Sequence, residues 1–337
     1  MIQQAVAKLM ERQDLTRAEM AATMEEIADG KATPAQVGAF LAALRLKGET
    51  VDEITGAAEV MRARAERIRV ERDVFVDTCG TGGDGRNTFN ISTAAAFAVA
   101  GAGVTVAKHG NRAVSSRAGS ADVLSALGVN VDAARDNVER SIDEIGIGFL
   151  FAPRLHPAFK AVAGIRRELG VRTIFNLLGP LANPAGARHQ VMGVYEPRWV
   201  PILAGVLQAL GAAHAFVVHG EGLDEIAVTG MTHVCEVKGG AVDRYAMVPE
   251  DMGLRRHPEA EIAGGDPERN ARILRDVLGG QKGAPRDAVL ANAAAALVCA
   301  GAAADLRAGV KLAGESIDRG HAAEKLSLLI TATNAKA

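Results

Sequence analysis

The first seventy residues repeat apolar positions at helical spacing and predict helices alone. Val37, Phe40, Leu41 and Leu44, for example, fall three or four positions apart and would share one helical face. Capping signals divide this region into separate helices, with starts at Thr16 and Glu19, Thr33 and Pro34, and Thr50 and Glu53, and stops at Gly30 and Gly48. The N-terminal part of the chain is therefore predicted to be all-helical.

After position 73, short apolar runs alternate with helical patterns. The predicted strands cover 74–77, 104–107, 148–151, 190–195 and 215–219, and the predicted helices cover 92–100, 121–127, 136–145, 158–169 and 199–210. A hairpin (232–237 and 241–245) and helices near 267–278, 286–302 and 306–331, the last broken near Gly320, complete the prediction. Such alternation predicts a mostly parallel central sheet with helices on both faces. The predicted fold class is α/β, with a small all-helical domain beside a larger α/β domain.

The composition agrees with this fold and excludes some partners. The chain has 337 residues, 48% hydrophobic and 23% charged, which suits two domains or one large one. Its formal net charge of -2 supplies no basic field for nucleic acid, and its few aromatic residues (4%) are not interleaved with basic ones for base stacking. We therefore expect no nucleic-acid partner.

The cysteines and the apolar runs bear on location. Cys79, Cys235 and Cys299 fit neither a zinc spacing nor a disulfide framework, so a reducing cytoplasm is expected. The first twenty residues are charged and have no apolar core, unlike a signal peptide. The longest apolar runs, 94–107 and 293–304, are shorter than the ~20 residues of a membrane helix. No membrane association is expected.

A glycine-rich loop, Gly80–Gly85, follows the first predicted strand. Glycine lets backbone N–H groups approach an anion, and the start of the next helix adds partial positive charge. The loop formally matches the G-x-G-x-x-G dinucleotide fingerprint. A nicotinamide site, however, needs an acidic residue at the end of the second strand, where this chain has Lys108. Phosphate binding is favoured over a dehydrogenase and over a plain connecting turn.

Two polar groups flank this loop in the predicted sheet. Asn90, Ser92 and Thr93 stand at the start of the next helix, where N-capping alone would need only one of them. The second group is a polar loop predicted at the carboxyl end of the second strand, with Lys108, His109, Asn111, Arg112, Ser115 and Ser116. Ligands of open α/β sheets bind at that edge, so a ligand with several phosphate groups is indicated. His109 is equally compatible with a structural hydrogen bond.

Three further motifs are less specific. Asp224 and Glu225 follow a strand and could hold a hard cation, although acidic pairs often only solubilise a loop. Arg166 and Arg167 lie on a predicted helix, where a guanidinium could bind a carboxylate or simply face solvent. The stretch 175–184 is predicted to be a turn-rich segment with an apolar lining.

Taken in order, these motifs resemble the anthranilate phosphoribosyltransferase family along nearly the whole chain. The matching motifs are Gly80–Asp84, Asn90–Thr93, Lys108–Ser116 continuing into Gly119–Leu124, Asn176–Pro184 and Leu223–Glu225. The resemblance implies a helical domain of residues 1–72 joined by an excursion at 168–188, and an α/β domain of residues 73–333. It also implies a homodimer joined through the helical domain.

The resemblance implies transfer of the phosphoribosyl group from phosphoribosyl pyrophosphate to the amine of anthranilate, in tryptophan biosynthesis. The implied donor site comprises Gly80, Gly83, Asp84, Thr88, Asn90, Ile91, Ser92, Thr93, Lys108, His109, Gly110, Asn111, Arg112, Ala113, Val114, Ser115, Ser116 and Ser120. Mg²⁺ would be held by Ser92, Asp224 and Glu225. Anthranilate would contact Gly80, Asn111 and Arg166, in a channel lined by His109, Gly179 and Pro180. No general acid or base is assigned.

One departure and two rival functions accompany the resemblance. Ile226 and Ala227 follow the acidic pair where the family often has leucine and a hydroxyl residue, but the carboxylates themselves remain. A related nucleoside phosphorylase would need neither the acidic pair nor Arg166. A catalytically silent paralogue that binds nucleic acid or a regulatory partner would have a basic surface and a degraded acceptor site. The net charge and the presence of Asn111 and Arg166 argue against it.

Overall fold

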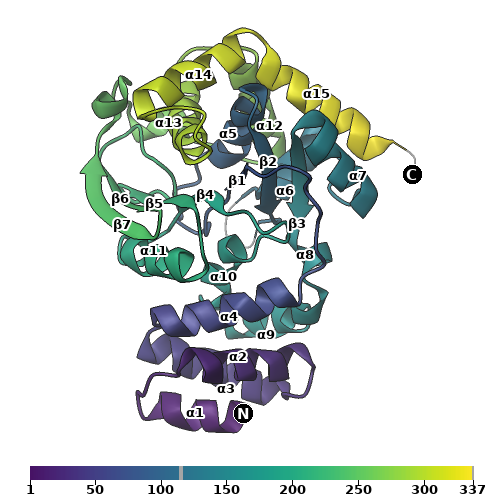
Figure 1. Ribbon diagram of the computed structural model, residues 1–337, viewed down its shortest axis with the longest axis vertical. Coiled ribbons are helices and arrows are strands. Elements are labelled where there is room, and N and C mark those ends of the chain that lie inside the picture. Colours follow the sequence, from purple (N-terminus) through teal and green to yellow (C-terminus); the bar gives the residue numbers. More distant parts are fainter. Residues whose placement is uncertain (114–116, 336–337) are drawn as a thin grey trace.

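The computed structural model describes residues 1–113 and 117–335 and has two parts. A small bundle of N-terminal helices stands below a larger α/β body (Figure 1). The predicted fold class is confirmed. The boundaries proposed for the two domains stay a prediction.

Four helices form the N-terminal bundle: α1 (Ile2–Met10), α2 (Arg17–Ala28), α3 (Pro34–Lys47) and α4 (Val51–Ala63). The three capping signals are confirmed as reciprocal capping boxes at Thr16, Thr33 and Thr50. Gly48 ends α3 with φ +93°, a backbone conformation that side-chain-bearing residues rarely adopt. The apolar faces pack together, so Phe40 and Leu44 are fully buried.

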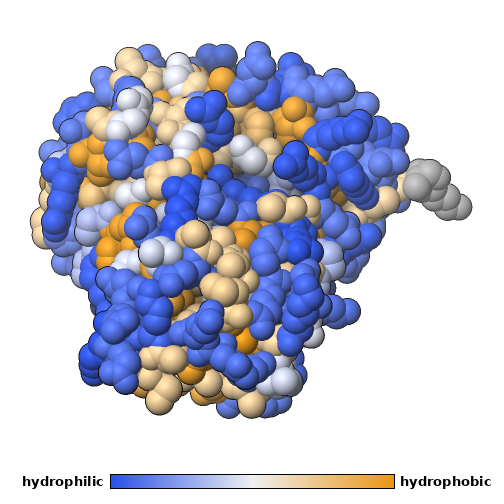
Figure 2. All heavy atoms as spheres, turned by 60° about the horizontal axis from the view of Figure 1, so that its bottom comes forward, coloured by the Kyte–Doolittle hydropathy of each residue, from blue (hydrophilic) through white to orange (hydrophobic). Residues whose placement is uncertain are grey.

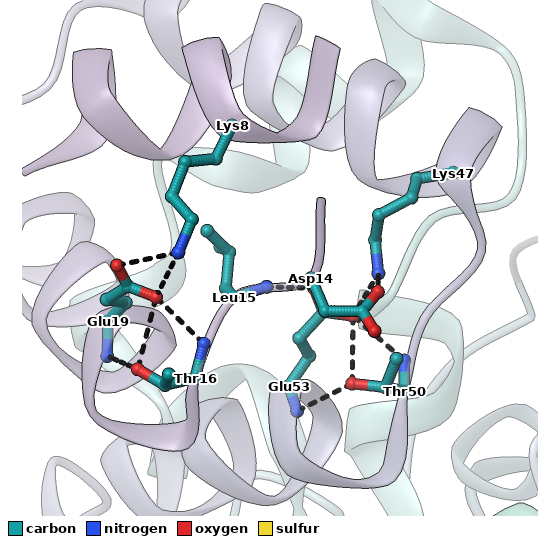
Figure 3. Close-up of polar contacts among 8 residues, drawn as sticks. All are labelled: Lys8, Asp14, Leu15, Thr16, Glu19, Lys47, Thr50 and Glu53. Atoms are coloured by element: carbon teal, nitrogen blue, oxygen red, sulfur yellow. Dashed lines mark hydrogen bonds and ion pairs between the residues drawn. The ribbon is translucent and has the colours of Figure 1, made fainter. Parts of the chain in front are cut away.

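Glu53 is buried inside this bundle and serves more than its own helix (Figure 3). One carboxylate oxygen accepts the Leu15 N–H at 2.9 Å, which ties α4 to the start of α2. The other accepts the Thr50 N–H and the Lys47 ammonium, each at 2.8 Å. Lys47 also bonds Asp14 at 2.6 Å. Glu53 of this capping box therefore connects α4 both to the segment before α2 and to the end of α3.

A seven-stranded sheet forms the centre of the α/β body. The strands are β1 (Phe75–Thr78), β2 (Thr105–Gly110), β3 (Ile147–Phe151), β4 (His189–Gly193), β5 (His214–Gly220), β6 (Thr232–Lys238) and β7 (Ala241–Met247). The order is β3-β2-β1-β4-β5-β6-β7. The first five strands in this order are parallel, β6 is antiparallel to β5, and β7 is antiparallel to β6. The predicted mostly parallel sheet and its terminal hairpin are confirmed.

Helices cover both faces of the sheet. On one face, α5 (Ile91–Gly101), α13 (Ala284–Cys299) and α15 (His321–Asn334) contact the sheet. The helices α6 (Ser120–Leu127), α12 (Pro267–Leu278) and α14 (Leu306–Asp318) pack around these three and share their apolar core. The other face packs on α11 (Trp199–Ala209) and α10 (Phe175–Leu181), and its apolar core continues into the N-terminal bundle. The remaining elements are α7 (Arg135–Arg140), η1 (Ser141–Ile145), α8 (Ala152–Leu155), η2 (Pro157–Phe159), α9 (Val162–Leu169), η3 (Pro249–Met252) and η4 (Glu259–Ile262).

Two predictions about local structure are wrong. The polar loop after the second strand begins later than predicted, because β2 pairs with β3 as far as Gly110 and so contains Lys108 and His109. The stretch predicted to be turn-rich forms the helix α10. Pro180 is tolerated near its end because few hydrogen bonds remain to be lost there, and Leu178 and Leu181 are buried.

The strand order places a topological switch point between β1 and β4. From β1 the chain passes through α5 to β2 on one side, whereas β4 is followed by β5 on the other. In open α/β sheets the crevice outside such a point is where ligands bind. The glycine loop lies there, directly after β1.

The connection between β3 and β4 leaves the α/β body and packs on the bundle. Helix α9 contacts α3, and α10 contacts α4. Arg62 of α4 donates to the carbonyl of Leu181 at 2.6 Å. Within residues 1–113 and 117–335, no helix is long and apolar enough to cross a membrane.

Glu53→Gln should lower the stability of the helical bundle by about 2–4 kcal/mol, because it leaves the ammonium of Lys47 buried with only Asp14 as partner. Calorimetry of the purified variant should show a lower melting temperature. Glu19→Gln is the matched control, since Glu19 occupies the same capping-box position on α2 but its side chain is 32% exposed. An equal loss in both variants would contradict the role given to Glu53.

Candidate active site

The glycine loop takes a backbone course that favours glycine at three of its positions. Gly82, Gly83 and Gly85 have φ angles of +65°, +84° and +76°. Gly80 meets a different constraint, because a Cβ there would lie 3.1 Å from the carbonyl oxygen of Gly193, at the end of β4. The loop therefore lies directly against the neighbouring strand end.

A closer contact joins the ends of β4 and β5. A Cβ on Gly193 would lie 1.5 Å from the carbonyl oxygen of Asp224, so only glycine fits there. The turn after β5, which carries Asp224 and Glu225, is thereby pressed against the switch point. The acidic turn contacts the glycine loop through a hydrogen bond in which the Asp224 N–H donates to Asp84 Oδ2 at 3.4 Å. These two residues are 140 positions apart in the sequence.

Lys108 supplies positive charge from inside the sheet. Its side chain is buried, and its ammonium donates to the carbonyl of Thr78, the last residue of β1. It also lies 3.5 Å from the hydroxyl of Ser92, in the first turn of α5. A buried cation is thus aimed at the ends of β1 and α5, below the glycine loop.

Asp84, Asp224 and Glu225 bring three carboxyl groups together beside that cation. Burial, followed by the charges of Asp84 and Glu225, raises the pKa of Asp224 well above its usual value. Burial also raises the pKa of Glu225 to about 7, although Lys108 and the Ser92 N–H favour its charged form. The acidic groups repel one another, and a bound cation would relieve that repulsion.

The residues fit a hard cation that arrives with a phosphate ligand. No three His, Cys, Asp or Glu side chains of the described residues form a ready-made metal site. Small hard cations, however, are commonly held by one or two carboxylates and by phosphate oxygens of the substrate. Asp224, Glu225 and the Ser92 hydroxyl offer oxygen donors of this kind.

Side-chain amides and the Asp122 carboxylate connect the N-terminus of α5 to the loop after β2. Asn90 is the N-cap residue but makes no capping bond; it donates to Ala118 O at 3.1 Å and accepts from Asn270 at 2.9 Å. Asp122 accepts the Ala113 and Gly119 N–H groups, each at 2.9 Å. These bonds fix the ends of the loop after β2 beside α5.

A second group of candidate residues lies on α9, α10 and β2. Arg166 is half-buried on α9, its guanidinium lies 5.6 Å from the centre of the Phe175 ring, and burial lowers its pKa. Within the described residues it has no carboxylate partner. A desolvated, unpaired guanidinium next to an aromatic ring suits a flat ligand that carries a carboxylate.

His109 is held neutral next to this region. Burial, followed by the nearby His156, lowers the pKa of His109 to about 3. Its Nδ1 lies 3.0 Å from the carbonyl of Gly179, an acceptor, so Nδ1 carries the proton. Its Nε2 is buried and has no hydrogen-bond partner among the described residues.

The structure gathers some of the residues expected at the site and directs others elsewhere. Gly80, Asp84, Ser92, Lys108, Asp224 and Glu225 meet at the switch point. Arg112 pairs instead with Asp122 at 3.1 Å, and the Ser120 hydroxyl donates to Asn111 O. Val114, Ser115 and Ser116 lie outside the described residues.

Sequence reasoning missed several residues of this region. Asp77 is fully buried, accepts from Asn183 at 2.8 Å and from the His109 N–H at 3.1 Å, and has its pKa raised by burial to about 6. Arg172 donates to Gly83 O, 89 positions away. No local pattern marks these partners, because only the folded chain brings them together.

Both parts of the chain match one family. Residues 3–65 match the helical bundle domain of the glycosyl transferase family, and residues 72–323 match its a/b domain.

Similar proteins cover the chain almost completely. An anthranilate phosphoribosyltransferase from Anaeromyxobacter sp. (strain Fw109-5) is 81% identical over 333 residues, covering 99% of each chain. The crystal structure of anthranilate phosphoribosyltransferase from Thermus thermophilus has a TM-score of 0.93 at 46% identity, covering 98% of this chain and 99% of that one. The Saccharomyces cerevisiae enzyme in complex with PRPP and Mg has a TM-score of 0.90 at 29% identity, covering 98% and 97%.

Glu225→Gln should stabilise the metal-free protein at alkaline pH. Because the folded-state pKa is about 7 and the ordinary value 4.5, stability falls as pH rises through this interval and the full cost persists above it. The neutral amide removes a cost of about 3 kcal/mol.

Melting temperatures with a chelator should agree at pH 5, and the variant should melt several degrees higher at pH 8. Glu221→Gln, on an exposed residue of the same turn, serves as control and should leave this pH profile unchanged. A variant that is equally or less stable at pH 8 would show that the carboxylate is not destabilising.

Proposed function

The chain belongs to the glycosyl transferase family, and on that premise we propose that it transfers the phosphoribosyl group of phosphoribosyl pyrophosphate to the amine of anthranilate. The products are N-(5-phosphoribosyl)anthranilate and pyrophosphate, in tryptophan biosynthesis. The observation that carries the proposal is the meeting of the glycine loop, the buried Lys108 and the acidic turn at one switch point. That arrangement joins anion-binding groups to oxygen donors for a cation.

The donor site of this proposal lies around the glycine loop. The loop N–H groups, the first turn of α5 and Lys108 would bind the phosphates, with Gly80, Gly83, Asp84, Ser92 and Lys108 nearest the switch point. The remaining proposed donor contacts are Thr88, Asn90, Ile91, Thr93, His109, Gly110, Asn111, Arg112, Ala113, Val114, Ser115, Ser116 and Ser120. Positive charge and N–H groups fixed before the ligand arrives stabilise the negative charge that develops on the departing pyrophosphate.

Mg²⁺ is part of the proposal, held by Ser92, Asp224 and Glu225. The oxygen-only donors and the raised pKa values of the two acids support it. When bound, Mg²⁺ neutralises charge on the leaving pyrophosphate. The similar yeast enzyme is in complex with PRPP and Mg.

The acceptor would bind between the two parts of the molecule. Arg166 would bind the carboxylate of anthranilate, with Gly80 and Asn111 nearby and His109, Gly179 and Pro180 lining the entry. The aromatic amine is a weak nucleophile, so these contacts act by holding it close to the ribose carbon. His109 is neutral and bonded to Gly179 O, and we assign it no proton transfer.

A homodimer and a cytoplasmic location complete the proposal. Figure 2, which brings the bundle end forward, shows apolar residues among the hydrophilic ones on that face. Leu46 of α3 and Met10 of α1 are 78% and 73% exposed, so this bundle leaves large apolar side chains for a partner to cover. The three cysteines are buried and free, as a reducing compartment allows.

The direct test mixes purified protein with anthranilate, phosphoribosyl pyrophosphate and Mg²⁺ and follows the loss of anthranilate fluorescence. We expect loss that depends on all three components and stops when Mg²⁺ is chelated. Phosphate-dependent cleavage of pyrimidine nucleosides, without loss of anthranilate, would favour the phosphorylase. Activity in neither assay would favour a silent paralogue.

Arg166→Ala should raise the KM for anthranilate about 10- to 100-fold, because a charged hydrogen bond to the carboxylate is lost. The KM for phosphoribosyl pyrophosphate should change by less than about threefold, since the donor site lies at the switch point. Arg167→Ala removes an exposed arginine from the same helix and should leave both values near wild type. Equal damage to both substrates would contradict the role given to Arg166.

A further inference from the structure

Besides the Asp224 N–H that donates to the Asp84 side chain, two groups outside the glycine loop hold its backbone and the Thr81 side chain. The Thr81 N–H donates to Gly193 O at 2.8 Å, and the Tyr195 N–H donates to the Thr81 hydroxyl at 3.1 Å. The second contact is at Gly83, whose carbonyl accepts from Arg172 Nη2 at 2.5 Å. The first contact is made by backbone atoms at the end of β4 and just after it, whereas the second is made by a single side chain from the connection between α9 and α10.

Arg172 reaches Gly83 with its guanidinium already oriented. The group lies 4.1 Å from the centre of the Tyr195 ring, and Nη1 is 3.5 Å from Glu196 Oε1. Stacking fixes the plane of the guanidinium, and the ion pair limits rotation within that plane. The side chain is nevertheless 41% exposed, so the fold does not depend on burying it.

The bond to Gly83 O controls a neighbouring donor. In a planar trans peptide, the carbonyl of Gly83 and the N–H of Asp84 point in opposite directions. Gly82 and Gly83 both have positive φ and no side chain, so their peptide planes can turn at little steric cost. Holding Gly83 O therefore also holds the Asp84 N–H, which has no acceptor within the described residues.

We propose that Arg172 is a positioning residue for the donor: it fixes the Gly83–Asp84 peptide so that the Asp84 N–H faces the diphosphate of phosphoribosyl pyrophosphate. This inference rests on the proposed function. Arg172 itself touches neither the diphosphate nor the acceptor. It acts through the orientation of one peptide plane in the glycine loop.

A simpler role for Arg172 would be general attraction of an anionic ligand. Lysine would provide that attraction equally well, and salt would screen it. Lysine cannot reproduce a planar group that stacks on Tyr195, pairs with Glu196 and donates to Gly83 O together. The lysine variant therefore separates orientation from charge.

The experiment measures binding of phosphoribosyl pyrophosphate by calorimetry, with Mg²⁺ and without anthranilate, for Arg172→Ala, Arg172→Lys and the control Arg167→Ala. Both Arg172 variants should raise the Kd about 10-fold or more at low and high salt, and the control should stay within about twofold. In steady state, their KM for phosphoribosyl pyrophosphate should rise while kcat and the KM for anthranilate stay within about twofold. Melting curves establish that each variant is folded.

Recovery of wild-type affinity by Arg172→Lys would overturn the inference, as would a loss that disappears at high salt. An unchanged affinity of the Arg172→Ala variant for phosphoribosyl pyrophosphate would also overturn the inference. In each of these cases the proposed function would still hold, provided that the wild-type protein is active. A wild-type protein that binds no phosphoribosyl pyrophosphate would overturn both.

Discussion

Backbone contact between three strand ends is the constraint on which the rest of the site depends. Gly80, after β1, lies against Gly193, at the end of β4, and Gly193 lies against the carbonyl of Asp224, after β5. A side chain at Gly193 would occupy the position of that carbonyl, so the acidic turn would have to move away. The distance between the glycine loop and the carboxylates of the acidic turn is therefore set by the absence of two side chains.

That contact brings carboxyl groups close together, so they repel one another, and a neighbouring cation reduces part of this repulsion. The pKa values of Asp224 and Glu225 are raised by burial, and their neighbour Asp84 adds repulsion. Lys108, buried below them, partly compensates for Glu225. A cation and an anionic ligand would stabilise such a site together, because each neutralises charge that the other would leave unpaired.

Much of this arrangement could be predicted from the sequence because its signals are local. A capping box such as Thr50 with Glu53 joins residues three positions apart, and the helices it predicts are present. Strand–helix alternation likewise predicted the parallel sheet, and strand polarity predicted which loops share an edge. The glycine loop, Lys108 and the acidic pair were expected to share that edge because parallel strands end together.

Local spacing along the chain is enough to give the series of helices and strands and the edge of the sheet at which polar residues gather, since both follow from patterns over a few positions. The tertiary structure alone decided which atoms meet. Pairing with β3 extends β2 so that it includes Lys108. The segment that packs on the bundle forms a helix that contains Pro180. Arg172 donates a hydrogen bond to Gly83 O, although the two residues are far apart in the sequence. Such contacts join residues far apart in the chain, and no local spacing encodes them.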